Sequence, residues 1–371
     1  MAHNIEIRKI NGVEVASFAE NGSRERAWHG LGNDQQIFDR PMFVSEALKA
    51  CNANYEVKLQ PVVALSDELL NAMDNGEFIN AAMLRDLLVD GRKATMRTDL
   101  NKTLGLVSDG YGIVQNEFAF KFVDMLCSGK FADRDETPVI ETCGVLGNGE
   151  RVFITCKMPN DIILNPHTDD RIETYVVFTT SHDGTGAVRC MVTNIRVVCQ
   201  NTLNWAMQHN SGRISFRHSS RVMNRLDLLN QENAKFAYNT LGLYNEYEKY
   251  FKESLEHLRN VQLSEKDLEN ILAEVALADD AKKVFFETRN IFHEDIATRG
   301  RNIFLGMREC IESGIGQDIL EKGNGLWAIN GITSYYQNEA NFKNQETKFD
   351  NLMDGGVYKK VNKAFEMLVA A

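Results

Sequence analysis

The chain has 371 residues, of which 43% are hydrophobic and 25% charged, as in a globular protein long enough to bury a sizeable core. Its 41 Lys and Arg against 52 Asp and Glu give a net charge of −11, which would repel nucleic acid if it were spread evenly. No run approaches the roughly 18 apolar residues of a membrane span, and the first residues show no secretion signal. We therefore expect a cytoplasmic protein with no membrane partner.

The first half of the chain predicts an α+β core over residues 1–218. A short helix should open at Pro41, because proline is favoured at the first helical position, and a strand should follow over 55–63. An acidic stretch near 66–91 has helical spacing and is interpreted as an insertion. Strand-like pieces over 92–98 and 104–108 then lead to a helix over 117–127, with Asn116 as its cap.

Two β-hairpins follow. Glycine-containing turn residues at 147–150 join two apolar runs, and an Asp183-Gly184 turn joins a second, stronger pair. A helix is expected directly afterwards, with Asn201 and Thr202 as its caps. The predicted fold class is therefore α+β, with antiparallel β-hairpins and packed helices in a β-β-β-α-like core.

Residues 219–371 predict a helical region with a C-terminal helical subdomain. One long helix should run from Ser219 to about Leu258, and the segment GLWAINGITSYY near the end predicts a further helix. Apolar residues recur every seven positions along the long helix, and such a stripe favours a partner helix from the same chain or from a neighbouring subunit. We expect a homo-oligomer, of which a ring is one form, with these contact residues: Val222, Leu229, Phe236, Leu243 and Tyr250.

The charge is distributed unevenly along the chain. Between Gly184 and Leu226 there is no Asp, Glu or Lys, and the charged residues are Arg189, Arg196, Arg213, Arg217, Arg221 and Arg225. A guanidinium group presents a planar fork of donors that matches phosphate oxygens, so this segment favours a polyanion as its ligand. Trp205 and Phe216 are candidates for stacking on bases.

Four stretches of the sequence are distinctive: AWHGLG, SHDGTGA, IRVVCQNTLNWAM and GLWAINGITSYY. They make the chain resemble the phage/plasmid-like proteins grouped under a domain of unknown function. That resemblance implies a mobile-element origin and a place among genes of DNA metabolism, and it brings no established activity. The order of the elements is also similar to the core of single-strand annealing recombinases, which assemble as rings and bind DNA along a basic groove.

We therefore expect a nucleic-acid-binding protein, with single-stranded DNA favoured, low sequence specificity and no cofactor. One alternative is a self-assembling structural or host-interaction protein, in which the arginines form salt bridges and bind no nucleic acid. A second is a metal-dependent nuclease or hydrolase built around His182 and Asp183, and Cys199 ahead of a helix is a conceivable nucleophile. The other cysteines are interpreted as packed thiols, because none is spaced as CxxC. No phosphate-binding glycine loop is present.

Overall fold

The computed structural model describes residues 40–128, 137–165, 170–197, 229–353 and 355–370, together with 9–10, 13–14, 18–21, 35–38, 167, 201–202, 213–216 and 218. Its main sheet has the strand order β13-β12-β11-β9-β8-β3-β4, with β10 added to β11 and β14 to β12. All pairs are antiparallel except β3 with β4. The strands are β3 (Phe18–Asn21), β4 (Gln35–Phe38), β8 (Val139–Leu146), β9 (Arg151–Lys157), β10 (Ile162–Asn165), β11 (Asp170–Ser181), β12 (Val188–Arg196), β13 (Asn201–Thr202) and β14 (Arg213–Phe216).

Both predicted hairpins are confirmed as the centre of this sheet. Residues 147–150 connect β8 to β9, and the Asp183-Gly184 turn lies between β11 and β12. Gly184 has a φ of +80°, a conformation in which a side chain would be strained, so glycine is the residue that this turn requires. A separate small sheet pairs β1 (Lys9–Ile10) with β2 (Val13–Glu14).

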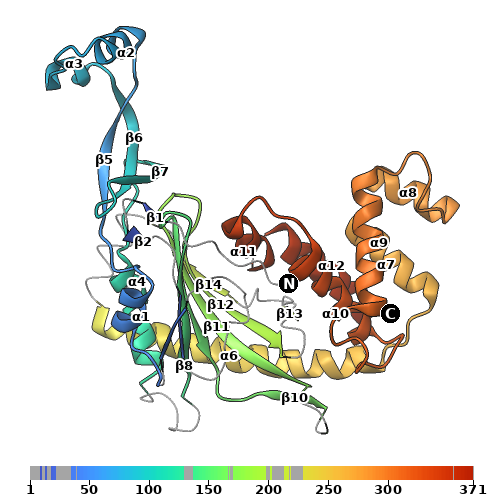
Figure 1. Cartoon of the computed structure of the whole chain (residues 1–371). Helices are drawn as coiled ribbons and strands as arrows, with labels where there is room; N and C mark the ends of the chain where they lie inside the picture. Colours follow the sequence, from blue (N-terminus) through green and yellow to red (C-terminus); the bar gives the residue numbers. More distant parts are fainter. Residues whose placement is uncertain are drawn as a thin grey trace.

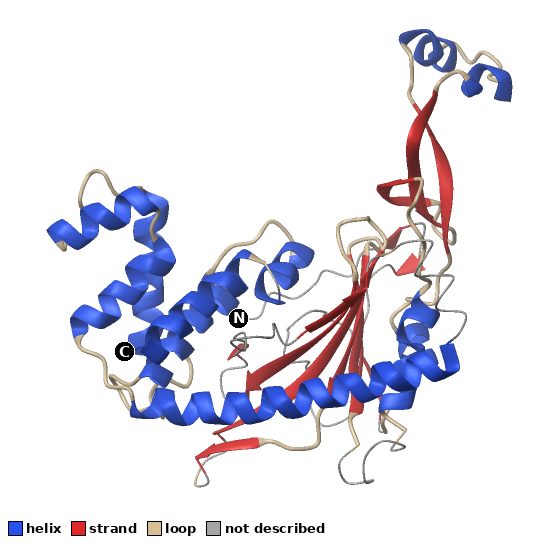
Figure 2. Ribbon diagram, turned by 180° about the vertical axis from the view of Figure 1, so that it is seen from behind, coloured by secondary structure: helices blue, strands red, loops and turns tan. Residues whose placement is uncertain are grey.

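One face of the sheet carries the hydrophobic core. Because side chains alternate along a strand, Ile172, Val176 and Phe178 of β11 point to the same face. There they join the core made with α1 (Val44–Ala50), α4 (Asn116–Leu126) and α6 (Leu229–Asn260). The rings of Phe122 and Phe178 meet edge to face at 4.9 Å, and the long helix α6 runs across the sheet (Figure 2). Each fully buried side chain of this kind contributes about 1.5–3 kcal/mol.

The opposite face of the sheet is more polar. It contains a small apolar cluster in which Phe349 and Met353 of α11 (Gln345–Met353) cover Phe153, Val177 and their neighbours.

The remaining C-terminal helices group beside the sheet at one end of α6 (Figure 1). The α+β fold class is confirmed. These helices are α7 (Glu265–Ala276), α8 (Asp279–Thr288), α9 (Thr298–Ser313), α10 (Gly325–Ser334), α11 (Gln345–Met353) and α12 (Gly356–Ala370), with a π-helical turn at Tyr335–Glu339.

A long arm projects from the core (Figure 1). Its shaft is the three-stranded antiparallel sheet β5-β6-β7, and two short helices form its far end. The elements are β5 (Val57–Val63), α2 (Asp67–Asp74), α3 (Ala81–Arg85), β6 (Leu88–Arg97) and β7 (Lys102–Ser108). The acidic stretch near 66–91 is therefore the end of the arm.

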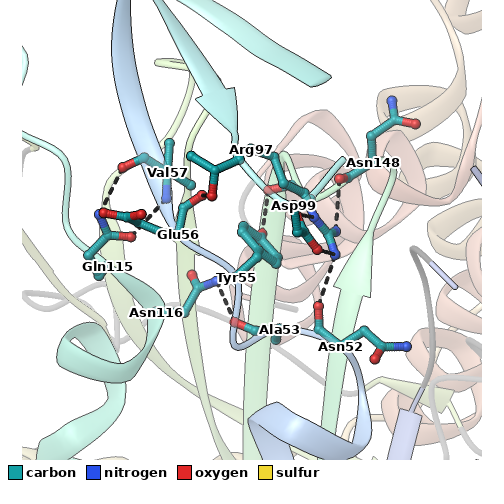
Figure 3. A network of polar contacts seen from close by, with 12 residues as sticks. Asn52, Ala53, Tyr55, Glu56, Val57, Arg97, Asp99, Gln115, Asn116 and Asn148 are labelled. Atoms are coloured by element: carbon teal, nitrogen blue, oxygen red, sulfur yellow. Dashed lines mark hydrogen bonds and ion pairs between the residues drawn. The ribbon is translucent and has the colours of Figure 1, made fainter. Parts of the chain in front are cut away.

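A buried polar network fixes the base of the arm to the core (Figure 3). The fully buried Arg97 donates to both carboxylate oxygens of Asp99 at 2.8 and 3.0 Å and to the carbonyls of Asn148 and Asn52. Its guanidinium also lies 3.9 Å from the centre of the Tyr55 ring. These contacts join the base of the arm to the β8-β9 turn and to the residues that follow α1.

Three local expectations were wrong. The first helix begins at Val44, where the Glu46 carboxylate accepts from the Phe43 backbone N–H at 3.0 Å, and not at Pro41. Asn116 does not cap α4 but lies inside its first turn. Asn201 and Thr202 form strand β13 beside β12 in place of helix caps. Within the described residues, none of the helices combines the length and apolar composition that crossing a bilayer requires.

Candidate nucleic-acid interface

The expectation that Arg196 lies on an open cationic surface is wrong. Arg196 is fully buried, and its Nε and Nη2 donate to the two carboxylate oxygens of Asp170 at 2.8 and 2.9 Å. Its Nη1 donates to the carbonyl of Gly316 at 2.9 Å. The charge is neutralised by an acid that stands 26 residues earlier and reaches it across the β11-β12 ladder. Arg196 is therefore a structural residue and is withdrawn from the candidate interface.

Arg189 belongs to a cluster at the turn end of the polar sheet face. It is the cross-strand partner of Thr179, and Arg151 of β9 is the cross-strand partner of Ser181. Because Thr179 and Ser181 point to the same face of β11, the two guanidinium groups flank that strand on one face. Arg151 donates from Nη2 to the hydroxyl of Thr185 at 3.3 Å. Burial lowers the pKa of the half-buried Arg189, and the like charge of Arg151 adds to that effect.

A carboxylate from a distant helix lies against this arginine pair. Asp350 of α11 accepts a hydrogen bond from Nη1 of Arg151, across 199 residues of sequence. Burial raises the pKa of Asp350, and the negative charge of Asp183 adds to the rise. The positive charges of Arg151 and Arg189 act in the opposite direction and lower it. The described cluster thus holds two guanidinium groups and two carboxylates, and one of the carboxylates comes from a helix that packs over the sheet.

The other end of the same face is already neutralised. Lys157 is 3.0 Å from Glu173, and Arg171 is 3.1 Å from Asp161. The hydroxyl of Tyr175 contacts Glu173 at 2.8 Å. Each of these cations has a carboxylate partner, and at the turn end Arg151 has one too in Asp350, so an anion that binds there has to compete with that carboxylate.

The arginine-rich segment continues along the same sheet edge. In β14, Ser215 pairs with Arg189 and Arg213 pairs with Met191, so the backbone of this strand runs beside β12. His218 lies next to the turn end, where its ring stacks on Tyr111 at 5.1 Å. Tyr111 donates to the carbonyl of Ser181 at 3.1 Å. The positions Arg217, Arg221, Arg225 and Trp205 lie outside the described residues, as do the side chains of Arg213 and Phe216.

His182 and Asp183 do not form a metal pair. His182 is fully buried on the core side, and its Nε2 lies 2.8 Å from Oδ1 of Asn116. Since the amide nitrogen of Asn116 donates to the carbonyl of Ala53, its oxygen is the acceptor and the His182 Nε2 carries the proton. Burial lowers the pKa of His182 to about 3, so the ring stays neutral.

The Asp183 carboxylate accepts from the backbone N–H and the hydroxyl of Thr185, as expected for a turn. No group of three or more His, Cys, Asp or Glu among the described residues is placed to hold a metal ion. The geometry of the described chain therefore gives no support to the hydrolase alternative. The six cysteines in this part of the chain are free, and Cys199 lies outside it.

The apolar stripe of the long helix has a partner within the chain at one position. Tyr250 meets Phe365 of α12 edge to face at 6.4 Å, and Tyr247 and Phe251 are buried in the core. The proposed oligomer contact at Tyr250 is thus an intramolecular one. Val222 lies outside the described residues, as do the side chains of Leu229, Phe236 and Leu243.

Sequence reasoning missed Arg151 and Asp350. Arg151 stands alone in sequence after a turn, and the only available signal was its place at the start of a strand paired with the Asp183-Gly184 hairpin. Asp350 is an ordinary helical acid, and nothing local marks it. The arrangement that results is a pair of guanidinium groups with a nearby hydroxyl and the carboxylates of Asp350 and Asp183. It can bind an anion of the phosphate type where that anion displaces the Asp350 carboxylate.

Fold and site together define a mixed α+β protein that gathers arginine side chains at one end of an antiparallel sheet. A family model described as a domain of unknown function, DUF932, matches residues 103–354, and the chain belongs to this family. The matched range begins within the arm, in β7, and leaves out the arm's far end at residues 66–91. No curated protein and no solved structure matches the chain.

Proposed function

We propose that this protein binds the phosphodiester backbone of nucleic acid at the turn end of its main sheet, with single-stranded DNA as the favoured ligand and little sequence specificity. The observation that carries the proposal is the pair Arg151 and Arg189, which flank β11 on one face; Arg151 donates to the carboxylate of Asp350, and the charge of Arg189 acts on the same carboxylate. Phosphate oxygens would take the place of that carboxylate, because both are anions that a guanidinium fork binds through two hydrogen bonds.

The sequence around this site supports the same ligand. The stretch from Gly184 to Leu226 contains six arginines and no acid, and β14 within it pairs directly with β12. With Arg196 removed from the set, five arginines of the stretch remain as candidate phosphate contacts. Contacts of this kind position a strand without reading its bases, so affinity should depend steeply on salt.

The cellular setting is part of the proposal. Resemblance to phage/plasmid-like proteins, and the likeness in element order to single-strand annealing recombinases, point to strand annealing in recombination or replication of a mobile element, in the cytoplasm of its host. No cofactor enters this proposal, since phosphate binding by guanidinium groups needs none.

The test is fluorescence anisotropy of a labelled single-stranded oligonucleotide with the full chain, over a series of salt concentrations. For the wild type, we expect the logarithm of the binding constant to fall linearly with the logarithm of the salt concentration. Arg189→Gln should reduce the magnitude of this slope by about 0.7, the value for one phosphate contact on a single strand. Arg92→Gln is the matched control, because it removes the same charge from an exposed position on the arm. A circular dichroism melt of both variants checks that they fold.

Two results would overturn the proposal. One is the absence of binding by folded wild-type protein at low salt, and the other is an equal effect of Arg189→Gln and Arg92→Gln. Duplex DNA and single-stranded RNA of the same length, measured in parallel, establish which nucleic acid is preferred.

A further inference from the structure

The end of the arm, residues 65–90, exposes an unusual amount of apolar surface, and we call this segment the arm tip. Half of the fourteen large hydrophobic side chains that are exposed among the described residues lie on it. Phe78 is the extreme case, with 87% of its surface accessible. A concentration of exposed apolar side chains on one short segment favours an interaction site in a folded protein. The seven residues are Leu65, Leu70, Met73, Phe78, Met83, Leu88 and Val89.

The base of the arm is anchored to the core by hydrogen bonds. The shaft joins the core through the Arg97 network, which bridges to Asp99, Asn52 and Asn148 (Figure 3). Gln115 of the core also bonds to both the N–H and the carbonyl of Val57, at 3.0 and 2.8 Å, as a neighbouring strand would. The tip therefore projects on the β5-β6-β7 shaft from an anchored base, where another molecule can reach it (Figure 1).

The charge of the tip argues against contact between two tips. The segment carries one Arg and six acids, a net charge of −5, so two tips brought face to face would repel one another. The acids are Asp67, Glu68, Asp74, Glu77, Asp86 and Asp90, and the single base is Arg85. The partner surface must therefore be apolar, must carry guanidinium or ammonium groups, and must differ from the tip.

Such a surface lies at the opposite end of the molecule, around the end of α8, and we call it the α8 patch. Phe292 is 63% exposed there and Phe286 is also exposed. Arg301 lies 5.5 Å from the centre of the Phe292 ring and, within the described chain, donates to backbone carbonyls. Arg289 lies over Phe286; it donates to the side-chain oxygen of Asn270 at 2.7 Å and lies 4.0 Å from the carboxylate of Glu269. Figures 1 and 2 both show α8 on the far side of the molecule from the arm.

The charge of the region around the α8 patch does not oppose binding of the acidic tip. Residues 279–301 carry five Lys and Arg against five Asp and Glu, so the segment as a whole does not repel an acidic partner. The two arginines lie among the aromatic rings, where they can meet the acids of the tip while Phe78 and Met73 cover the rings.

We propose that the arm tip of one chain docks on the α8 patch of a second copy. Because the two surfaces are different and lie at opposite ends of the chain, the contact is head to tail and extends to a closed ring or a filament. The contact does not depend on nucleic acid. The tip lies before the residues that the DUF932 model matches, and the α8 patch lies within them.

The experiment is sedimentation velocity of the full chain over a dilution series, with single and mixed variants. Phe78→Ser and Phe292→Ser should each weaken self-association by about tenfold or more, as truncation of an aromatic anchor does. Phe43→Ser is the matched control, because Phe43 is 62% exposed near the N-terminus of α1, away from both surfaces.

Mixing the two variants shows whether the contact joins the tip of one chain to the α8 patch of another. A Phe78→Ser chain retains its α8 patch and a Phe292→Ser chain retains its tip, so the mixture contains one intact kind of junction and should form dimers that do not grow. A wild type that stays monomeric at the highest concentration overturns the proposal. So does a Phe292→Ser chain that assembles as the wild type does, which would indicate contact through the tips alone.

Discussion

Removal of either partner of the Arg196–Asp170 ion pair should destabilise the fold severely. Both side chains are almost completely excluded from solvent, at 0% and 2% exposure, and the guanidinium also donates to the carbonyl of Gly316. The pair therefore joins the end of β12 to the start of β11 and to the loop after α9. Arg196→Met and Asp170→Leu each leave one charge buried without its partner.

The expected magnitude follows from that burial. A buried charge that loses its partner costs about 3–5 kcal/mol, a large part of the roughly 5–15 kcal/mol that stabilises a typical domain. The double variant removes both charges and replaces them with apolar side chains of similar volume. Its loss of stability should be well below the sum of the two single losses, because apolar replacement of a whole buried pair is often close to neutral.

Urea unfolding followed by circular dichroism measures all three free energies of unfolding. If a single variant fails to fold, recovery of folding in the double variant is still the expected result. Single losses under about 1 kcal/mol, or losses that simply add, would refute the reasoning. Salt-dependent DNA binding by the double variant should match that of the wild type, since Arg196 is structural.

Three further predictions test the site and the fold. Asp350→Asn should raise affinity for single-stranded DNA several-fold and steepen the dependence of log affinity on log salt concentration by about 0.7, because the carboxylate no longer competes with phosphate. Asp318→Asn is the control at an exposed position. Unchanged affinity would speak against phosphate binding at the place of the Asp350 carboxylate. His182 has a folded pKa of about 3 against an ordinary 6.5, so below pH 6.5 only the unfolded chain gains its proton and stability falls by up to about 1.4 kcal/mol per pH unit. His182→Gln should flatten that decline in urea-unfolding curves, and an unaltered slope would contradict it. Arg97→Met should lower stability by about 1–3 kcal/mol, because the carbonyls of Asn148 and Asn52 lose their donor while the 41% exposed Asp99 stays solvated. The change should also expose the arm base to proteolysis, and wild-type resistance to protease would count against the network.

The elements that sequence predicted well are those with local causes. The turn at Gly184 needs a positive φ, and the apolar alternation on either side of it sets the register of β11 and β12. Local signals misled at Asn116, a good capping residue whose amide bonds instead to Ala53 and His182, because the buried histidine requires an acceptor.

The arginine site could be predicted only in part, for a physical reason. A stretch without acids appears cationic in sequence, but antiparallel pairing brought Asp170 to Arg196 across the hairpin ladder. In the same way, a helix far along the chain brought Asp350 to Arg151. Neutralisation of a charge depends on tertiary contacts, and a count of residues along the chain does not contain them.

Hydrogen–deuterium exchange of the full chain, with and without single-stranded DNA, tests the central claim most directly. The account predicts slower exchange in β14, β12 and the start of β9, where the Arg151 and Arg189 backbones lie, and no change in the arm tip at a concentration where the chain is monomeric. Protection confined to other elements, or none at saturating DNA, would contradict it.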